Sequence, residues 1–196
     1  LNSLSEKDIL SGIGEMCHYF IIAGEKNFYQ YRNDYNDYKI NKFILSKMIS
    51  DSLSIKKKYI EFDEFDQNKR QIFNYGHSFG HAIESLTNFK IPHGIAVSFG
   101  MDIANFISVK MGILKPEIRD EIRKFLKNIW KDFSINDLDI DKFRQALSKD
   151  KKNIGNELRL ILCRGYGRVF KSPVSNDSVF ANYLKEYFEK EAHWFY

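Results

Sequence analysis

The sequence contains little cysteine and little proline. Its two cysteines, Cys17 and Cys163, form no CxxC pair and no disulfide pattern, which is typical of proteins in a reducing cytoplasm. Only three prolines occur in 196 residues, and this scarcity favours helices over a turn-rich β fold. No apolar run approaches the roughly 18–20 residues of a membrane-spanning helix. We therefore expect a cytoplasmic protein with no membrane partner.

The net charge of +4 is a mild bias. Short basic clusters occur at residues 56–58 and 149–152, the second interrupted by Asp150, and neither alternates with aromatic residues. We therefore expect no nucleic-acid partner. The positive balance suits small acidic molecules instead.

Helical periodicity dominates most of the chain. Ser5 is placed to cap a first helix, with Asp8 at its third position. The polar segment 31–37 predicts a break between helices or an exposed turn. Further helices are predicted over residues 39–60, after an acidic cap at 63–66, over 95–114, from 116 to 130 and over 179–191.

The pattern changes after residue 152. Segments 158–163 and 168–170 flank the sequence Arg-Gly-Tyr-Gly, which predicts two short strands joined by a glycine turn. No internal repeat or linker divides the chain. We predict one mostly α-helical domain over residues 1–196, with one small β-hairpin.

Three of the five histidines lie within 25 residues, in the run Arg70-Gln-Ile-Phe-Asn74-Tyr-Gly-His77-Ser-Phe-Gly-His81-Ala-Ile-Glu84 and the following Pro92-His93-Gly94. His77 and His81 are four residues apart, so on a helix their Cβ atoms lie about 6 Å apart on one face. Two imidazoles at this spacing can reach one metal ion, and a turn can bring His93 to the same face. A carboxylate would complete a three-ligand catalytic site, although spacing does not select which one. The alternatives are a phosphate site, or histidines that cap helices or hydrogen-bond within the core.

Arg70 lies seven residues before His77, and Asn74 lies seven residues before His81. Seven residues make nearly two helical turns, so each pair would share one side of a single helix. A guanidinium binds carboxylate or phosphate, and an amide can donate to an oxyanion. These side chains predict a polar stripe that faces an anionic ligand. The alternative is a surface ion pair between Arg70 and Asp66.

The same residues resemble the signature of 3-dehydroquinate synthases and related sugar-phosphate cyclases. Residues 74–84 and 93–101 are similar to two motifs of that family, in the same order. Residues 10–15, Leu-Ser-Gly-Ile-Gly-Glu, are similar to its Ser-Gly-x-x-Glu segment, and residues 150–152 resemble its later Asp-Lys-Lys stretch. The resemblance covers the chain to about residue 170. It implies the C-terminal helical domain of a dehydroquinate synthase-like fold.

The resemblance implies a metal ion at the histidine motif. The ligands of this zinc or cobalt ion would be Glu15, His77 and His93. His81 would lie near the substrate phosphate and assist its elimination. Zinc would act as a Lewis acid on hydroxyl and carbonyl oxygens, which suits an open three-ligand site.

The resemblance also implies a substrate, a seven-carbon keto-acid phosphate. Lys56 and Arg70 would hold its carboxylate, and Asn74 would contact it. Lys151 would approach the phosphate, unless the neighbouring Lys152 takes that role. The family uses bound NAD to oxidise an alcohol transiently, expels phosphate, reduces the ketone and closes the ring by aldol addition.

Two departures from the family pattern bear on the substrate. His18 stands three residues after Glu15, where the family usually has lysine; it is shorter and mostly neutral at pH 7, yet could donate to a substrate hydroxyl. Ile95 replaces a glutamate beside His93, and with it a carboxylate that could orient the ligand. Both favour a divergent synthase or a cyclase of another sugar phosphate, such as a heptulose or hexose phosphate. The retained lysine and arginine favour a carboxylated substrate.

The family's N-terminal NAD-binding domain is expected to lie outside this chain. Gly12-Ile-Gly14 is not expected to bind NAD, because no strand precedes it and Cys17 stands where a third glycine is required. NAD would bind mainly to the other domain, and the isolated chain would be inactive. The complete enzyme could be a homodimer, as synthases of this family often are. The alternative from another class is a non-catalytic helical module that binds a partner.

Overall fold

A computed structural model describes residues 3–38, 40–62, 69–149 and 156–192. The elements are α1 (Glu6–Ala23), α2 (Glu25–Tyr38), α3 (Lys42–Phe62), the 3-10 helix η1 (Lys69–Asn74), α4 (His77–Leu86), α5 (His93–Lys110), α6 (Pro116–Trp130), α7 (Ile140–Ser148), β1 (Glu157–Cys163), β2 (Val169–Ser175), α8 (Ser178–Glu186) and the π-helix η2 (Tyr187–Glu191). The predicted mostly α-helical domain with one small hairpin is confirmed. Within these ranges, no helix is long and apolar enough to cross a membrane.

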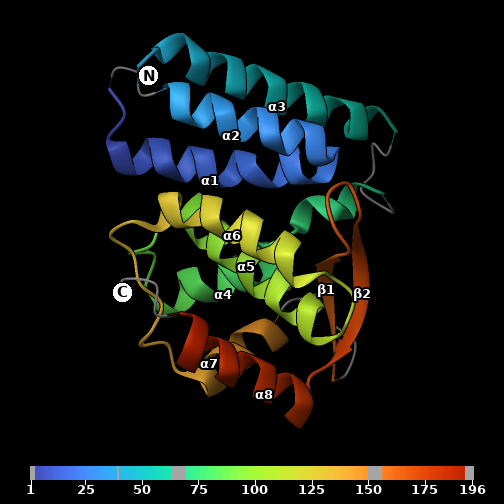
Figure 1. Cartoon of the computed structure of the whole chain (residues 1–196). Helices are drawn as coiled ribbons and strands as arrows, with labels where there is room; N and C mark the ends of the chain where they lie inside the picture. The colour runs from blue at the N-terminus through green and yellow to red at the C-terminus, as the bar shows by residue number, and fades with distance from the viewer. Residues whose placement is uncertain (1–2, 39, 63–68, 150–155, 193–196) are drawn as a thin grey trace.

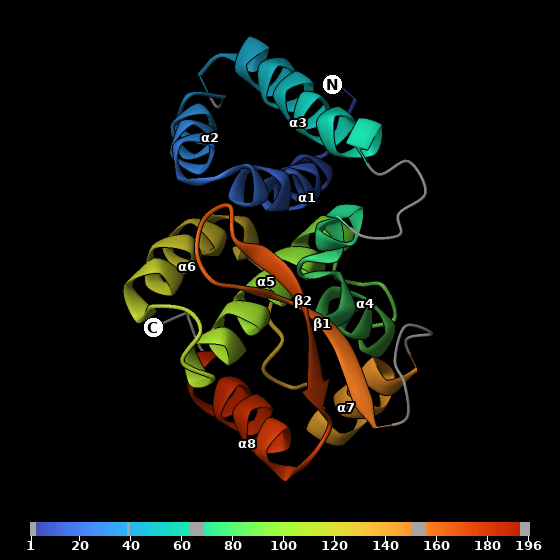
Figure 2. The ribbon, with the colours of Figure 1, turned by 90° about the vertical axis from the view of Figure 1, so that its right-hand side faces the viewer.

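Helix α5 forms the centre of the molecule. It is buried continuously from Gly94 to Ser108, which requires a mostly apolar sequence on every side and a partner for each buried polar side chain. It contacts α1, α4, α6 and β1. In Figures 1 and 2, α1, α2 and α3 form a layer on one side of α5 and α6, and α7 and α8 lie at the opposite end.

The antiparallel hairpin runs along one side of this helical body (Figure 2). Leu158 pairs with Val174 and Cys163 with Val169. In its glycine turn, the Gly167 N–H donates to the Ile21 carbonyl at 2.9 Å. The turn is thereby fixed to the end of α1.

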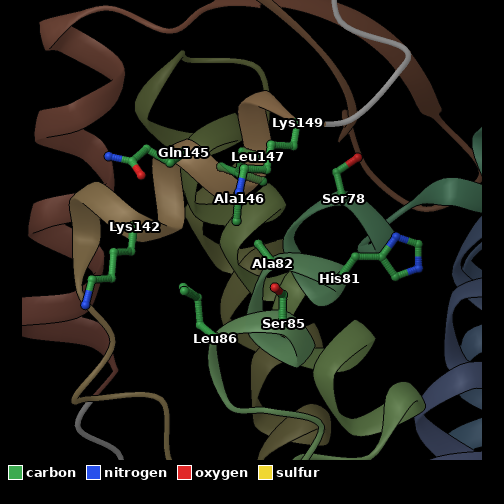
Figure 3. A pocket seen from close by; sticks show the side chains of 10 residues that line it. All are labelled: Ser78, His81, Ala82, Ser85, Leu86, Lys142, Gln145, Ala146, Leu147 and Lys149. Carbon is green, nitrogen blue, oxygen red and sulfur yellow. The ribbon is translucent and has the colours of Figure 1, made fainter.

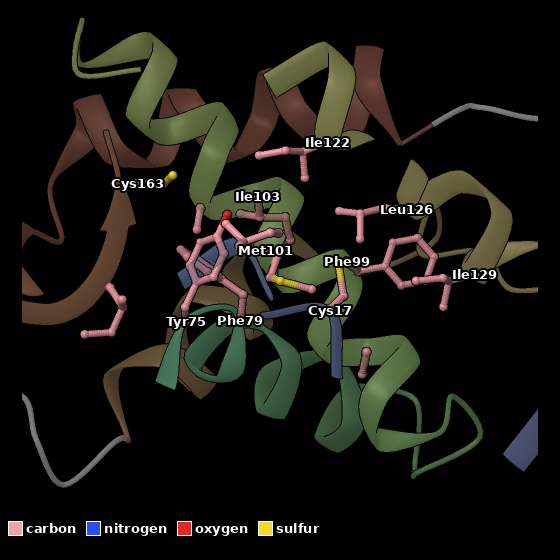
Figure 4. Packing of buried hydrophobic residues seen from close by; sticks show 14 of the residues in the cluster. Cys17, Tyr75, Phe79, Phe99, Met101, Ile103, Ile122, Leu126, Ile129 and Cys163 are labelled. Atoms are coloured by element: carbon pink, nitrogen blue, oxygen red, sulfur yellow. The ribbon is translucent and has the colours of Figure 1, made fainter. Parts of the chain in front are cut away.

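Side chains from α1, α4, α5 and α6 meet in the core around Phe99 and Met101 (Figure 4). Trp130 stacks on Phe99, with ring centroids 4.6 Å apart, and its indole N–H donates to Ser98 Oγ at 2.9 Å. The buried Tyr75 hydroxyl donates to Asn105 Oδ1 at 2.6 Å. These contacts hold α5 at a fixed depth beneath the helices that cover it.

Glycine allows α1 and α5 to touch backbone to backbone. A Cβ on Gly94 would lie 1.8 Å from the Ser11 carbonyl oxygen, and a Cβ on Gly14 would lie 2.2 Å from the Gly94 carbonyl oxygen. The Gly94 N–H also donates to Ser11 Oγ at 3.0 Å. Gly14 is therefore required for helix packing, whereas Gly12 faces open space.

Several predicted elements are confirmed. The capping box of Ser5 and Asp8 is present at the start of α1, α6 spans Pro116–Trp130, and the hairpin occurs where it was predicted. The predicted helix over 179–191 is α8 followed by a π-helical turn. The expected acidic cap at 63–66 lies outside the described residues.

The break predicted at residues 31–37 is wrong, because α2 runs through this segment. Tyr31 and Tyr35 are buried; Tyr31 stacks on Phe20 and donates to the Ile13 carbonyl at 2.6 Å. Of the polar residues between them, Asn33 is exposed, whereas the buried Asp34 accepts from Lys47 Nζ of α3 at 2.7 Å. Helix α7 had no counterpart in the sequence analysis, although Asp139 caps it by accepting from the Lys142 N–H at 3.0 Å.

Candidate metal centre

Three side chains converge from three helices. Glu15 comes from the middle of α1, and His77 and His93 are the first residues of α4 and α5. Glu15 Oε2 lies 3.5 Å from Nε2 of each imidazole. The three possible ligand atoms lie within 4.8 Å of one another. Contact between Gly14 and Gly94 brings Glu15 and His93 together, since each of these two residues is next to one of the glycines.

The second nitrogen of each imidazole contacts an acceptor. Nδ1 of His77 is 3.2 Å from the Tyr75 carbonyl oxygen, and Nδ1 of His93 is 3.1 Å from Glu84 Oε2. A carbonyl or an ionised carboxylate only accepts, so each Nδ1 carries the hydrogen. The lone pairs of both Nε2 atoms then point towards Glu15. Metal-binding histidines are held in this way by an acceptor behind the ring.

The Glu15 carboxylate fits a bound cation. Its Oε2 atom is buried and has no hydrogen-bond partner among the described residues. Burial acts to raise the pKa of Glu15, but contact with His77 and the charges of His18, His77 and His93 outweigh it and lower the pKa to about 2. That lowering requires imidazoles that donate a hydrogen or carry positive charge. Neutral imidazoles with the hydrogen on Nδ1 turn their Nε2 lone pairs towards the carboxylate instead, and a cation bound between these side chains would then supply the positive charge. Two imidazoles and one carboxylate are a ligand set that zinc uses in catalytic sites.

The single helix predicted to carry Arg70, Asn74, His77 and His81 is wrong, whereas the anionic ligand they were expected to face stays a prediction. Arg70 and Asn74 belong to η1, whereas His77 and His81 belong to α4. Between these elements the chain turns at Gly76, whose φ is +82°. A Cβ there would lie 2.6 Å from the Val97 carbonyl oxygen, so α5 also requires glycine at this corner.

The structure describes the side chains of only some of the other residues expected to bind substrate. The Asn74 amide donates to the Gln71 carbonyl at 3.0 Å. Lys56 reaches the same side of α1 as Glu15: its Nζ lies 5.8 Å from the Tyr19 ring centroid, and all three line one pocket of about 330 Å³ between α1 and α3. The Arg70 side chain and all of Lys151 lie outside the described residues, as does Lys152.

His81 lies beside the three converging residues. Its ring centroid is 5.7 Å from those of His77 and His93, and it stacks on the latter. It also lines a pocket of about 780 Å³ between α4 and α7, into which Lys142 and Lys149 contribute positive charge. Figure 3 shows the His81 ring pointing away from the α7 side chains. His81 therefore lies between the three converging residues and a basic pocket.

His18 is enclosed. Its ring packs against Tyr19, Phe73 and His77, with centroids 3.9, 6.0 and 5.2 Å away. The side chain has no exposed surface, and both ring nitrogens lack a hydrogen-bond partner within the described ranges. Burial lowers the pKa of His18 to about 3, so the ring is neutral. The structure shows this ring packed against the His77 ring, and the donation to a substrate hydroxyl expected of His18 stays a prediction.

Ile95 lies wholly in the core. The carboxylate expected to be lost behind His93 is nevertheless present, because Glu84 supplies it from α4. Glu84 belongs to the histidine motif, but no role was predicted for it from the sequence. Its spacing, seven residues after His77, could have placed it on the same side of α4. The acceptor behind His77 is the backbone carbonyl of Tyr75, and residue spacing in the sequence could not predict it.

The family model described as 3-dehydroquinate synthase C-terminal matches residues 12–153 of the chain. The chain belongs to this family. The matched range contains the three converging residues as well as His18, Lys56 and Glu84. The resemblance seen in the sequence motifs is therefore confirmed, as is the fold class of a dehydroquinate synthase C-terminal domain.

Curated relatives of the dehydroquinate synthase family support this assignment. The chain is 31% identical over 186 residues to a bifunctional 3-dehydroquinate synthase/phosphatase of Fusobacterium nucleatum, covering 91% of the chain and 27% of the relative. It is 30% identical to the 3-dehydroquinate synthase of Ruminiclostridium cellulolyticum (94% and 52% covered) and 35% identical to that of Dictyoglomus turgidum (86% and 48% covered). The chain thus spans about half the length of most of these relatives, and less of the bifunctional one.

Solved structures share the fold of this dehydroquinate synthase domain. A 2-deoxy-scyllo-inosose synthase in complex with carbaglucose-6-phosphate, NAD+ and Co2+ matches with a TM-score of 0.75 and 22% identity, covering 96% of the chain and 53% of that protein. A 2-epi-5-epi-valiolone synthase of Streptomyces hygroscopicus with NAD+ and Zn2+ bound matches with a TM-score of 0.73 and 14% identity, covering 96% and 53%. At these identities the likeness concerns the fold.

Proposed function

We propose that the chain is the metal- and substrate-binding domain of a 3-dehydroquinate synthase. The observation that carries this proposal is the buried Glu15 Oε2 atom, which has no hydrogen-bond partner among the described residues and faces the Nε2 atoms of His77 and His93 at 3.5 Å. The reaction is the NAD-dependent cyclisation of a seven-carbon keto-acid phosphate, with loss of phosphate. Family membership and the relatives' names support this choice.

In this proposal Glu15, His77 and His93 hold zinc or cobalt. When bound, the ion polarises hydroxyl and carbonyl oxygens of the substrate. Tyr75 and Glu84 keep a hydrogen on each Nδ1, so that both Nε2 lone pairs stay available. The ligands come from the ends and the middle of rigid helices, which limits their motion.

The substrate would lie across the metal centre, with its two charged ends on opposite sides. Lys56 and Arg70 would bind the carboxylate, and the position of Lys56 beside Glu15 supports this. His81 and Lys151 would contact the phosphate; the basic pocket that His81 lines favours an anion there. Asn74 would donate its amide to the substrate.

A second domain would supply the NAD site. The relatives are about twice as long as this chain, and two similar structures were solved with NAD+. We propose that an NAD-binding domain covers the metal centre in a cytoplasmic enzyme, that this chain alone is inactive, and that the assembled enzyme is a homodimer.

A second candidate is another sugar-phosphate cyclase. It is favoured by His18, because a buried neutral imidazole replaces a charged lysine beside the metal centre. An assay that offers keto-acid, heptulose and hexose phosphates to a polypeptide that also carries the NAD-binding domain separates the candidates. Turnover of the keto-acid phosphate is expected. Turnover only of a sugar phosphate that lacks a carboxylate would favour the second candidate.

The first test is zinc binding by the chain. We expect one zinc ion per chain in the wild type, almost complete loss in His77→Ala and in His93→Ala, and retention in His81→Ala, which lies beside the ligands. Metal analysis after dialysis and competition with a chromophoric chelator measure stoichiometry and affinity. Absence of zinc in the wild type, or equal loss in His81→Ala, would contradict the assignment.

A further inference from the structure

The Glu84 carboxylate lies behind His93, on the side opposite Glu15. Its Oε2 atom is 3.1 Å from Nδ1, while Nε2 on the far side of the ring is 3.5 Å from Glu15 Oε2. We infer that Glu84 is a positioning residue that fixes the tautomer and the orientation of His93. The inference rests on the proposed function, since it acts through a proposed ligand.

Burial makes the contact with His93 important for Glu84. The Glu84 side chain is 10% exposed, whereas the His93 side chain is 44% exposed. Within the described part of the chain, the Glu84 carboxylate has one hydrogen-bonded partner, the His93 ring. A buried carboxylate needs a donor to offset its lost hydration. The imidazole is the more exposed of the two side chains and therefore the one with more room to rotate.

Consequently, Glu84 dictates which nitrogen of His93 is protonated. Hydrogen on Nδ1 leaves the lone pair on Nε2, directed at Glu15. Without Glu84, the exposed ring could rotate or carry its hydrogen on Nε2, and either change would remove a ligand atom from the site. His77 needs no such side chain, because a backbone carbonyl does the same for its Nδ1.

Glu84 could instead be a ligand of a second metal ion. His81, Glu84 and His93 offer atoms within 4.8 Å of one another. That site would require the lone pair of His93 Nδ1, which is incompatible with donation to Glu84. The geometry favours the hydrogen bond, because 3.1 Å is an ordinary donor–acceptor distance.

The test compares Glu84→Ala and Glu84→Gln with Ser85→Ala, a matched change at the adjacent exposed position of α4. Zinc affinity is measured by chelator competition. We expect a 10–100-fold loss in Glu84→Ala, as for other carboxylates behind metal-binding histidines, a smaller loss in Glu84→Gln, whose amide oxygen still accepts, and no change in Ser85→Ala. Thermal unfolding of each metal-free protein monitors folding, and Glu84→Gln keeps the side-chain volume if the alanine variant fails to fold.

A second readout needs no metal. Long-range 15N–1H spectra of the metal-free protein, at a pH where imidazole is neutral, report which nitrogen of His93 is protonated. We expect Nδ1–H in the wild type and a shift towards Nε2–H in Glu84→Ala.

The outcomes separate this inference from the proposed function. Unchanged zinc affinity and an unchanged His93 tautomer in Glu84→Ala would overturn the inference and leave the proposed function intact. Two zinc ions in the wild type and one in Glu84→Ala would also overturn it, in favour of the second-ion site. If the wild type binds no zinc, the proposed function fails, and the tautomer of His93 alone decides the role of Glu84.

Discussion

At the scale of single residues, Ser5 and Asp8 form a capping box at the N-terminus of α1. The Asp8 N–H donates to Ser5 Oγ at 3.2 Å, and the Ser5 N–H donates to Asp8 Oδ2 at 3.2 Å. We expect Ser5→Ala to lower the free energy of unfolding by about 1 kcal/mol, because it leaves a helix N–H without its acceptor. Urea unfolding measures this difference, and Ser3→Ala, which lies before the helix, is the control.

The same cap predicts a pH dependence. Hydrogen bonds from Ser5 lower the pKa of Asp8 below its ordinary value of 3.8. Because the folded pKa is the lower one, the stabilisation is complete above pH 3.8 and is lost as the pH falls through the folded pKa. The stability difference between wild type and Asp8→Asn should therefore shrink in acid. A difference that stays constant from pH 7 to pH 2 would contradict this.

At the scale of whole helices, the close contact between α1 and α5 predicts that a larger residue at position 94 lowers stability. In Gly94→Ala the new methyl group would meet the Ser11 carbonyl oxygen at 1.8 Å, so the two helices must separate. We expect a loss of about 1–3 kcal/mol in unfolding free energy, together with weaker zinc binding, because Glu15 moves away from His93. Chemical unfolding and chelator competition measure the two effects.

Gly12→Ala is the matched control on α1. A Cβ there meets nothing within 4 Å, and alanine is the better helix former by roughly 0.5–1 kcal/mol. The variant should therefore be as stable as the wild type or slightly more stable, with unchanged zinc binding. Equal damage by Gly12→Ala and Gly94→Ala would contradict the close-contact explanation.

The sequence determines some elements locally and others only through packing. Helix α6 was predictable because Pro116 opens it and an amphipathic pattern continues to Trp130. The break at Gly76 was not, because it depends on contact with Val97 of α5. Similarly, the histidine spacing identified His77 as a candidate ligand, but the residues alone could not single out Glu15, which lies about 60 positions earlier in the chain.

At the scale of the whole molecule, a buried ionic cluster joins α5, α6 and η2. Asp102 Oδ2 accepts from Arg123 at 2.6 Å and from the Tyr187 hydroxyl at 2.8 Å, and Oδ1 accepts from Arg119 at 3.2 Å. Glu191 contacts both arginines. Removal of the central charge leaves two arginines poorly compensated inside the protein.

We therefore expect Asp102→Asn to lower the free energy of unfolding by about 3–5 kcal/mol. The control is Lys110→Ala on the same helix, which breaks the ion pair with Glu186 at the surface and should change stability by no more than about 1 kcal/mol. Denaturant unfolding compares the two. Similar losses of unfolding free energy in both variants would show that the buried cluster stabilises the protein no more than the surface ion pair does.

The three converging side chains also bear on the order in which the chain folds. His77 and His93 are neighbours in sequence, but Glu15 must be brought across a loop of about 60 residues. Closing so long a loop is entropically unfavourable, and the docking of α1 on α5 offsets this cost. An early intermediate that lacks this docking would hold a metal through two imidazoles alone, and weakly. Tight metal binding would therefore appear late in refolding. The time at which it appears would report when α1 docks on α5.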